Sequence, residues 1–421
     1  MLDIKFIREN KDLIKKTCEQ KNVDIDLDFM LELDKEIFSI KQKLQDLREE
    51  KNAITTTIPS LKDNEKKEAI AKSKDLNDKI KVYETELATK QPDFDDMMWR
   101  IPNIPAPDVP VGKDDSKNVV LRREGTPRKF DFEPRDHYDI LEINGWADFK
   151  RIAKVCGSRS YTLKGAASRL EIALHMYMMD KLTAKGFTMI TVPSMVKEEA
   201  LYGTGHFPTG RDDVYYLPKE NLYLSGTAEI VLTSLHRDEI LEENQLPILY
   251  AGYSPCFRSE AGAAGKDVRG LIRVHQFMKV EQYVICKADL AESEKWYNTL
   301  LETAEEVLKD LELPYQVIAC CTGDMGAGKY KMYDLEAWTP SQNKYRETHS
   351  CSNLLDWQAR RANLRYRENA TGKVKYCYTL NNTGIATPRI LAPFLENHQT
   401  ADGKVRIPEK LRPYMNGKEY L

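Results

Sequence analysis

Three consecutive segments indicate the fold and the chemistry of this chain most strongly: Cys256-Phe-Arg-Ser-Glu260, Ala261-Gly-Ala-Ala-Gly-Lys-Asp-Val-Arg-Gly270 and Arg273-Val-His-Gln-Phe277. The outer two are predicted to be strands, so Arg258 and Glu260, two residues apart, point to the same face of a sheet. The small residues between the strands would let the backbone approach a ligand closely. A guanidinium beside an aromatic ring suits a nucleotide, with Arg258 on a phosphate and Phe277 stacked under a base. A core salt bridge between Arg258 and Glu260 explains the same pattern, and the local sequence leaves both interpretations open.

A second motif comes near the end of the chain, where Asn381-Asn-Thr-Gly-Ile-Ala-Thr-Pro-Arg389 leads into a helical run over residues 390–396. The small residues Gly384 and Ala386 are typical of a strand that packs closely against a neighbour. Arg389 is predicted near the start of the helix, where the helix dipole and the guanidinium both favour an anion. A proline at the first helical position beside an exposed arginine is the alternative interpretation. The sequence contains neither G-x4-G-K-[ST] nor G-x-G-x-x-G, so a standard phosphate loop is not expected.

Length and composition set the broad class. The chain has 421 residues, of which 41% are apolar and 31% are charged, and this predicts two or three globular domains. No stretch approaches the roughly 20 apolar residues of a membrane-spanning helix, and the charged start over residues 1–10 lacks the apolar core of a secretory signal. We therefore expect a cytoplasmic protein with no membrane partner. The formal net charge of −3 means that nucleic acid would bind only through local patches.

The cysteines and histidines give no local metal motif. The eight cysteines contain no C-x2-C pair and the seven histidines contain no H-x3-5-H run, so zinc is not expected. In a cytoplasmic protein these thiols stay reduced, and each cysteine is interpreted as a small buried apolar residue.

Residues 27–97 predict a long helical hairpin. Apolar residues recur in steps of three and four, the heptad pattern of a coiled coil, at Met30, Leu33, Ile37, Ile40, Leu44, Leu47 and Ile54 and again at Ala69, Leu76, Ile80, Tyr83 and Leu87. The β-branched, proline-containing segment 55–63 between the two series predicts a reversal of the chain. The first helix would reach on the order of 40 Å. The pattern fits an oligomerisation coiled coil or an arm that probes a large partner, and composition does not separate the two.

After the hairpin the sequence changes character. Prolines at positions 92, 102, 105, 107 and 110 predict an extended segment, with the linker placed at 101–112. From residue 113 to residue 421, β-type runs alternate with helical periods, as at 168–182 and 291–311. This mixture predicts an α+β domain with a largely antiparallel sheet.

Taken together, these motifs resemble those of class II aminoacyl-tRNA synthetases. The stretch from Phe257 to Phe277 resembles motif 2, the stretch from Gly384 to Arg389 resembles motif 3, and Pro193 fits the proline of the dimer-forming motif 1. Three further stretches are similar to the seryl-tRNA synthetase family within this class: Ser225-Gly-Thr-Ala-Glu229, Glu347-Thr-His-Ser-Cys-Ser-Asn353 and Met1-Leu-Asp-Ile-Lys-Phe-Ile-Arg-Glu-Asn10. The resemblance covers the chain from Met1 to the Arg412-Pro-Tyr-Met415 tail.

The resemblance implies a fold and an activity. The fold would be an antiparallel-sheet class II catalytic domain over 113–421, joined by the linker to an N-terminal tRNA-binding domain over 1–100 that carries the antiparallel coiled-coil arm. The activity would be the activation of L-serine with ATP to seryl-adenylate and pyrophosphate, followed by transfer of serine to the 3′ end of serine tRNA. The resemblance leaves open whether selenocysteine tRNA is also charged.

The resemblance also assigns residues by their match to the family motifs. The catalytic cations would be Arg258 on the α-phosphate and Arg389 on the γ-phosphate. The ATP-binding set would be Arg258, Ser259, Glu260, Val274, Phe277, Glu347, Thr348, His349, Ser350 and Arg389. Mg²⁺ would be held by Glu347 and Ser350. The serine-binding set would be Thr227, Ala228, Glu229, Glu281, Asn381 and Thr383. His349, at a position where many family members carry a small polar residue, is expected to be neutral and near the nucleotide, and Ala386 replaces a third glycine of motif 3.

Partners follow from the same resemblance. The hairpin would lie along the long variable arm of serine tRNA, and motif 1 implies a homodimer. The alternative is a paralogue that makes seryl-adenylate but passes it to an acceptor other than tRNA. Relatives of that kind are expected to lack the arm, whereas this chain has the heptad pattern over 27–97. A decayed catalytic domain would have lost Arg258, Glu281 or Arg389, and all three are present.

Overall fold

The computed structural model describes residues 1–261 and 270–421. The small-residue segment 262–269, which is expected to approach a ligand, lies outside the described residues. The chain divides into two compact units. The helical unit contains Leu2–Glu19 and Val23–Ile101, and the α+β unit contains Met1, Gln20–Asn22 and Pro102–Leu421. None of the helices in the described part of the chain combines the length and the hydropathy of a membrane-spanning segment.

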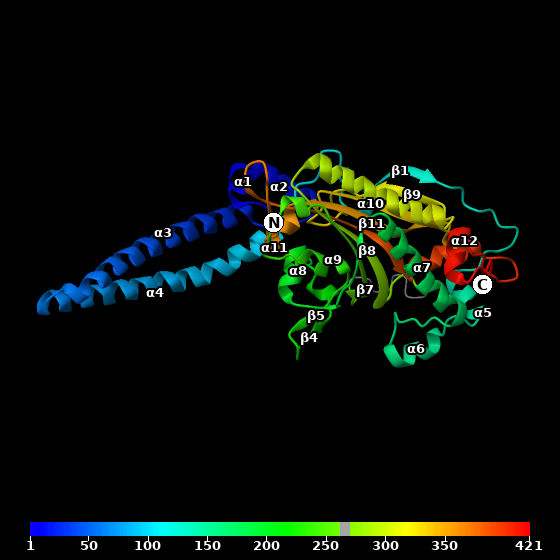
Figure 1. Cartoon of the computed structure of the whole chain (residues 1–421), viewed down its shortest axis with the longest axis horizontal. Helices are drawn as coiled ribbons and strands as arrows, with labels where there is room; N and C mark the ends of the chain where they lie inside the picture. The colour runs from blue at the N-terminus through cyan, green and yellow to red at the C-terminus, as the bar shows by residue number, and fades with distance from the viewer. Residues whose placement is uncertain (262–269) are drawn as a thin grey trace. The chain divides into compact units, whose positions relative to one another are not determined.

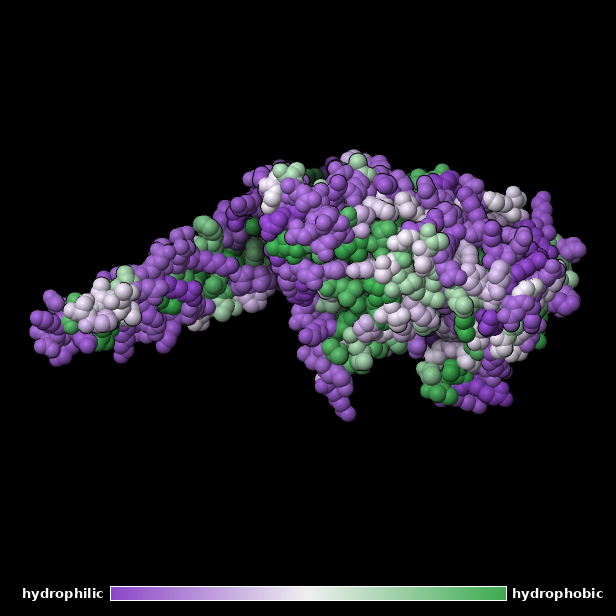
Figure 2. Space-filling view, viewed as in Figure 1, coloured by the Kyte–Doolittle hydropathy of each residue, from purple (hydrophilic) through white to green (hydrophobic). Residues whose placement is uncertain are grey.

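Two long helices dominate the helical unit (Figure 1). Its helices are α1 (Ile4–Glu9), α2 (Lys11–Gln20), α3 (Leu27–Thr57) and α4 (Asp63–Arg100). α3 and α4 pack along each other as a hairpin, with Ile40 and Leu44 of α3 buried against Ile80 of α4. The outer surfaces of both helices are mainly hydrophilic in Figure 2. The predicted antiparallel helical arm is thus confirmed, with its heptad seam on the inside.

The reversal between these helices is shorter than the predicted segment 55–63. α3 continues to Thr57, and a 3-10 turn at Ile58–Ser60 follows. The hydroxyls of Thr55 and Thr56 donate to carbonyl oxygens four residues earlier at 2.7 and 2.8 Å, which accommodates these β-branched residues in the last turns of the helix.

α4 also extends further than the proline pattern predicts. Pro92 lies inside α4, which runs on to Arg100. Proline lacks one backbone donor, but the good helix formers before it and the apolar contacts of the hairpin maintain the helix. The extended segment therefore begins after Arg100.

The α+β unit is organised around a sheet to which the described residues contribute eight strands, in the order β1-β9-β10-β11-β14-β8-β7-β2. Its strands are β1 (Val119–Glu124), β2 (Thr188–Thr191), β7 (Ile248–Phe257), β8 (Gln276–Cys286), β9 (Tyr315–Ala319), β10 (Lys331–Thr339), β11 (Lys344–Leu355) and β14 (Tyr378–Thr387). Neighbouring strands are antiparallel except for β2 and β7, which are parallel. The predicted α+β class with a largely antiparallel sheet is confirmed.

Helices and short strands surround this sheet (Figure 1). The helices are α5 (His137–Ile143), α6 (Phe149–Cys156), α7 (Gly165–Ala184), α8 (Glu198–Thr204), α9 (Ala228–Ser234), α10 (Leu290–Asp310), α11 (Trp357–Ala362) and α12 (Leu391–His398). The short strands are β3 (Met195–Val196), β4 (Tyr216–Leu217), β5 (Leu222–Leu224), β6 (Ile240–Glu242), β12 (Arg365–Arg367) and β13 (Val374–Tyr376). The helical periods predicted at 168–182 and 291–311 correspond to α7 and α10.

The two faces of the central sheet carry different side chains. On β8, Val280 and Val284 join an apolar core that α7 and α10 cover. Lys279 and Glu281, which alternate with them, line a cavity on the other face. This follows from the two-residue period of a strand. The face away from α7 and α10 is therefore where a polar site can form.

Gly384 lets β14 pack closely on the covered face, as its size predicts. A Cβ at this position would lie 2.9 Å from both the Met178 Cε atom and the Val280 carbonyl oxygen. Any larger residue would have to move the backbone of β8, and with it the polar side chains on the opposite face.

The proline-rich segment is part of the α+β unit from Pro102 onward. The backbone N–H of Asn103 donates to the Ala327 carbonyl at 2.9 Å, and that of Ala106 donates to the Tyr330 carbonyl at 2.8 Å. The segment thus forms hydrogen bonds with the chain just before β10.

Candidate active site

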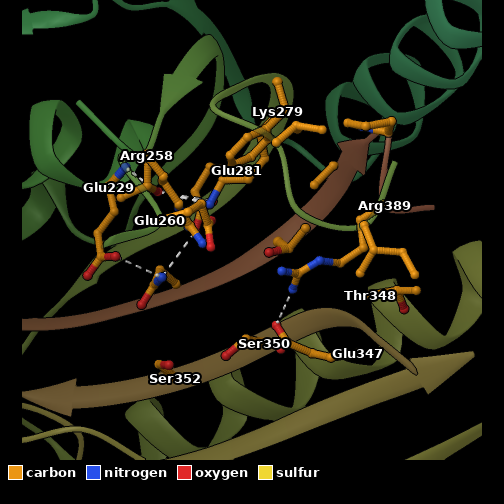
Figure 3. Close-up of a pocket in the computed structure, with 18 of the residues that line it drawn as sticks. Glu229, Arg258, Glu260, Lys279, Glu281, Glu347, Thr348, Ser350, Ser352 and Arg389 are labelled. Carbon is orange, nitrogen blue, oxygen red and sulfur yellow. Dashed lines mark hydrogen bonds and ion pairs between the residues drawn. The ribbon is translucent and has the colours of Figure 1, made fainter. Parts of the chain in front are cut away.

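A cavity of about 240 Å³ lies on the open face of the central sheet (Figure 3). Both predicted cations, Arg258 and Arg389, line this one cavity. The other predicted site residues that line it are Thr227, Glu229, Glu260, Val274, Phe277, Glu281, Glu347, Thr348, Ser350, Asn381 and Thr383. Residues that are far apart in the sequence therefore meet around one space, as the motif assignments require.

The Arg258 side of the cavity carries an aromatic ring. Arg258 follows β7 directly, and its backbone N–H donates to the His275 carbonyl at 2.9 Å. Its guanidinium carbon lies 5.3 Å from the centre of the Phe277 ring. Glu260 forms an ion pair with Arg273 instead, with 3.0 Å between Oε2 and Nη1. The guanidinium of Arg258 is thus free of the predicted alternative bridge and is directed at the cavity beside a flat apolar surface.

The Arg389 side is fixed by two further elements. Nη1 of Arg389 lies 3.0 Å from Oε1 of Glu347 on β11. Two residues earlier, the Thr387 hydroxyl donates to Glu171 Oε1 at 2.8 Å and lies 2.8 Å from Nε2 of His175, and both of these residues belong to α7. The end of β14 is therefore anchored to α7, and the guanidinium is oriented across the cavity toward an acidic side chain.

Between the two arginines lies a network of buried polar residues. Lys279 forms an ion pair with Glu281 and donates to the Thr227 hydroxyl at 2.9 Å. Asn381 donates to Glu281 Oε1 at 3.0 Å. Burial raises the pKa of Glu281, and the nearby Glu229 adds to this shift while Lys279 opposes it. A partner that donates hydrogen bonds would therefore stabilise the ionised form of Glu281.

Glu229 completes this network from the first turn of α9. Its carboxylate accepts from Gln358 at 2.7 Å and from Asn381 at 3.3 Å. Burial alone would raise its pKa, but Lys329, His206 and other polar neighbours outweigh burial, so the pKa is lowered. Oδ1 of Asn381 is buried without a hydrogen-bond partner among the described residues. The network can thus accept hydrogen bonds from a small ligand that carries an ammonium or a hydroxyl group.

Three predicted residues do not line the cavity. Ala228 packs beneath it, where a Cβ on Gly252 of β7 would lie 2.8 Å from the Ala228 Cβ. The Ser259 hydroxyl donates to the Asp212 carbonyl at 2.5 Å. Buried His349 lies 3.0 Å from the Gly384 carbonyl through Nε2, and burial lowers its pKa to about 4, so its ring is neutral at pH 7. Ligand contacts of these three residues stay predictions.

The cavity is also lined by residues that are not predicted as site residues, although Ser352, Ala386 and Pro388 lie within the motif stretches. The additional lining residues are His206, Leu271, Ile272, Lys279, Lys329, Ser352, Ala386 and Pro388. Lys279 could have been found, because it precedes Glu281 by two residues on the same strand and must share its face. His206 and Lys329 come from irregular segments with no periodicity, and no local pattern in the sequence places them near a site.

The described residues contain no group of three or more His, Cys, Asp and Glu side chains arranged to hold a metal ion. Glu347 and Ser350 both line the cavity and offer one carboxylate and one hydroxyl. Such a sparse oxygen set suits a cation that keeps most of its waters and is bound together with a phosphate ligand.

Family models match both parts of the chain. The model described as tRNA synthetase class II core domain (G, H, P, S and T) matches residues 215–398, which hold most of the cavity. Together with the antiparallel sheet and the paired arginines, this match identifies residues 215–398 as a class II tRNA synthetase core domain. The model described as seryl-tRNA synthetase N-terminal domain matches residues 1–105.

Individual relatives narrow the class. The chain is similar to a serine–tRNA ligase of Deinococcus radiodurans, with 52% identity over 421 residues that cover 100% of this chain and 99% of that protein. A serine–tRNA ligase of Thermodesulfovibrio yellowstonii is 43% identical over 420 residues, 99% of each chain. The crystal structure of seryl-tRNA synthetase from Pyrococcus horikoshii complexed with ATP matches with a TM-score of 0.90 and 42% identity, covering 100% of this chain and 99% of that one. The chain therefore belongs to the seryl-tRNA synthetase family.

Proposed function

We propose that this chain activates L-serine with ATP to form seryl-adenylate and pyrophosphate, and then transfers serine to the 3′ end of serine tRNA. The observation that carries the proposal is the position of Arg258 and Arg389 at one cavity, with the polar network around Glu281 between them. Two anions, a carboxylate and a triphosphate, have to meet in the first step, and this arrangement supplies fixed cations for them.

In the first step the serine carboxylate attacks the α-phosphorus in line with the leaving pyrophosphate. No protein nucleophile is needed, so the contribution of the chain is positioning and charge neutralisation. Arg258 would neutralise the α-phosphate above the Phe277 ring, with adenine stacked on that ring beside Val274. Arg389 would exchange its ion pair with Glu347 for oxygens of the γ-phosphate.

Serine would be held by the buried acceptors of the network. Glu281 and Glu229 offer carboxylate oxygens to the ammonium and the hydroxyl, and Thr227, Asn381 and Thr383 line the same space. Alanine would leave a buried acceptor without its donor, and such a loss discriminates more strongly than the loss of one methylene group.

Mg²⁺ would be held with ATP by Glu347 and Ser350. Oε1 of Glu347 lies 3.0 Å from Nη1 of Arg389, so this carboxylate and the arginine proposed for the γ-phosphate lie on the same side of the cavity. When bound, the cation neutralises phosphate charge that builds up as pyrophosphate leaves.

The tRNA-binding role belongs to residues 1–100, with 101–112 as the connection to the catalytic domain over 113–421. Many charged residues of the hairpin pair with each other, as Arg48 does with Glu84 and Lys90 with Glu36. We therefore expect the hairpin to read the shape and backbone of a long variable arm with moderate, salt-sensitive affinity.

A homodimer in the cytoplasm would complete the active form, because Pro193 follows β2 at the position of the motif 1 proline. Exposed apolar residues on α7 support an interface there, since Ile172 is 51% and Met176 is 43% exposed. One subunit's hairpin would then serve tRNA that is bound at the other subunit's active site.

The decisive test is ATP–pyrophosphate exchange with serine, threonine, alanine and glycine. We expect exchange that depends on serine, with the other three amino acids weaker by about two orders of magnitude or more. Equal exchange with alanine would contradict the proposed role of the buried carboxylates. Exchange with serine but no charging of serine tRNA would instead favour the paralogue that uses another acceptor.

A further inference from the structure

The loop Gly326–Lys329 carries one residue that lines the cavity, Lys329. Lys21 and Asn103 hold this loop by hydrogen bonds. The Lys21 amine donates to the carbonyl oxygens of Gly326, Ala327 and Lys329 at 3.3, 3.1 and 2.5 Å. Asn103 donates from its backbone to Ala327 at 2.9 Å and from Nδ2 to the Gly328 carbonyl at 3.2 Å. Every carbonyl group of the loop therefore has a partner from outside the loop.

Packing restricts the loop further. A Cβ on Gly328 would lie 2.6 Å from the Trp357 ring, so only glycine fits between this ring and the backbone. Lys21 itself is 6% exposed, which is rare for lysine unless the buried amine has acceptors. These hydrogen bonds and this packing restrict the loop to one conformation. In this conformation the side chain of Lys329 lines the same cavity as Glu229.

Lys331 and Lys329 differ in whether a carboxylate pairs with the ammonium group. Lys331 forms ion pairs with Asp108 at 2.8 Å and Glu294 at 3.2 Å. Among the described residues, no carboxylate lies within ion-pair distance of Lys329. Within the described part of the chain, its charge is therefore not paired with a carboxylate and is available to the groups that line the cavity.

We propose that Lys329 is a positioning residue for serine activation: the held Gly326–Lys329 loop places its ammonium group in the cavity that Glu229 lines, where it helps to orient this carboxylate as an acceptor for the substrate. Lys21 and Asn103 hold the loop that places this charge. The inference rests on the proposed function and adds to it, because it assigns a positive charge in the same cavity to Glu229, whereas Glu281 is paired directly with Lys279.

The groups that face Glu229 support this assignment. Lys329 is the strongest of the charges that lower the pKa of this buried carboxyl against the effect of burial. The others are His206 after α8 and Lys279 on β8, while Glu281 on β8 is a like charge. α11 presents the amide of Gln358 and β14 presents the amide of Asn381. Burial lowers the pKa of His206 to about 4, so near pH 7 this ring is neutral and Lys329 and Lys279 supply the positive charge.

The test compares Lys329→Met with Lys329→Arg in the full-length protein. The readouts are the KM for serine, the KM for ATP and kcat in ATP–pyrophosphate exchange between about pH 6 and pH 8.5. In Lys329→Met the pKa of Glu229 should rise, so the KM for serine should be higher than in the wild type and should increase more than in the wild type as the pH falls over this range. The KM for ATP should follow the wild type, and Lys329→Arg should restore the wild-type profile for serine.

A second pair of variants tests the positioning role. Lys21→Met should shift the serine profile in the same direction by a smaller factor. Asn22→Ala is its matched control, because Asn22 bonds to the carbonyls of Lys113 and Gly323 and not to the Gly326–Lys329 loop. Asn22→Ala should keep the wild-type profile, and thermal unfolding of each variant checks that it is folded.

Two results would overturn the proposal. One is a Lys329→Met enzyme whose serine KM has the same pH profile as the wild type. The other is an equal loss in every kinetic constant at every pH, which indicates a purely structural role. A wild-type enzyme without any serine-dependent exchange would refute the proposed function instead, so the two failures are distinguishable.

Discussion

The hairpin and the cavity are the two regions to which we assign a function, but they are encoded in opposite ways. The seam of the hairpin repeats along two continuous helices, and each buried residue contacts neighbours that the heptad register already determines. The cavity takes its charged residues from the segment after β7, from β8, α9 and β11, from the segment after β14 and from the loop that carries Lys329. We therefore expect that the hairpin can be deleted as a whole without loss of the cavity. In the cavity, by contrast, a single substitution should be enough to lower the activity.

The largest effect should come from removing the hairpin. Deletion of residues 30–95 should abolish the charging of serine tRNA, because the surface that we propose for the variable arm is lost. Serine-dependent ATP–pyrophosphate exchange should remain near the wild-type rate, because the residues that line the cavity and the Lys21 contacts are retained. The measurement is both assays on the same preparation.

Residues 30–95 begin and end inside α3 and α4, so a short flexible connection should replace them. A deleted enzyme that charges tRNA as fast as the full chain would show that the hairpin has no part in the second step. Loss of both activities together would show that the two units are not independent.

The next largest effect should come from one guanidinium. Arg389→Ala should lower ATP–pyrophosphate exchange by about two to three orders of magnitude, the usual cost of one preorganised group that stabilises the transition state. Arg389 is partly exposed at the cavity and forms an ion pair with partly exposed Glu347, so the fold should survive. Circular dichroism and sedimentation measure the fold and the association state. Near-normal exchange in this variant would refute the role of Arg389.

The hairpin and the cavity also differ in how much of each could be predicted from the sequence. The hairpin could be predicted because heptad spacing is a local rule, and Ile37, Ile40 and Leu44 are buried as that rule requires. The prediction is wrong only about where the helices end. Threonine hydroxyls bond to the backbone in the last turns of α3, and Pro92 is tolerated within α4. Such ends depend on individual side-chain contacts that a periodic pattern does not contain.

The cavity was predictable only where residues belong to motifs. Arg258, Glu281 and Arg389 are predicted from the resemblance to the family and do line the cavity, while their roles stay predictions. Strand alternation accounts for Lys279 beside Glu281. Lys329 could not be placed, because its position depends on a loop that is held by a residue more than 300 positions away in the sequence. Non-local contacts of this kind are fixed by the folded structure and leave no spacing in the sequence.

Acid should destabilise the α+β unit more than the helical unit, and we expect this effect to be intermediate in size. Burial lowers the pKa of His175 and His398 to about 4, whereas an unfolded histidine titrates near 6.5. The unfolded state therefore binds more protons, and stability is full above about pH 6.5 and falls as the pH decreases toward about 4. Each of these histidines can contribute a loss of about 3 kcal/mol in the α+β unit. The helical unit contains no histidine.

Hydrogen exchange on the full-length protein, corrected for intrinsic rates, checks this difference. Between about pH 6.5 and pH 4.5, protection should fall in α7 and α12 and should change little in the middle of α3 and α4. Parallel losses in both units would indicate that the hairpin is stabilised by the α+β unit and not by its own seam.

The smallest effect should come from an ion pair on the surface of the hairpin. Nη2 of Arg48 on α3 lies 2.7 Å from Oε1 of Glu84 on α4, and the two side chains are 57% and 45% exposed. Because water and salt screen such a pair, the coupling in a double-mutant cycle of Arg48→Ala and Glu84→Ala should stay below about 1 kcal/mol. It should vanish in about 1 M salt, where the screening length is only a few ångströms. Urea unfolding followed by far-ultraviolet circular dichroism measures the coupling. A coupling of about 2 kcal/mol or more would mean that specific charge pairs, and not the apolar seam, determine the register of the hairpin.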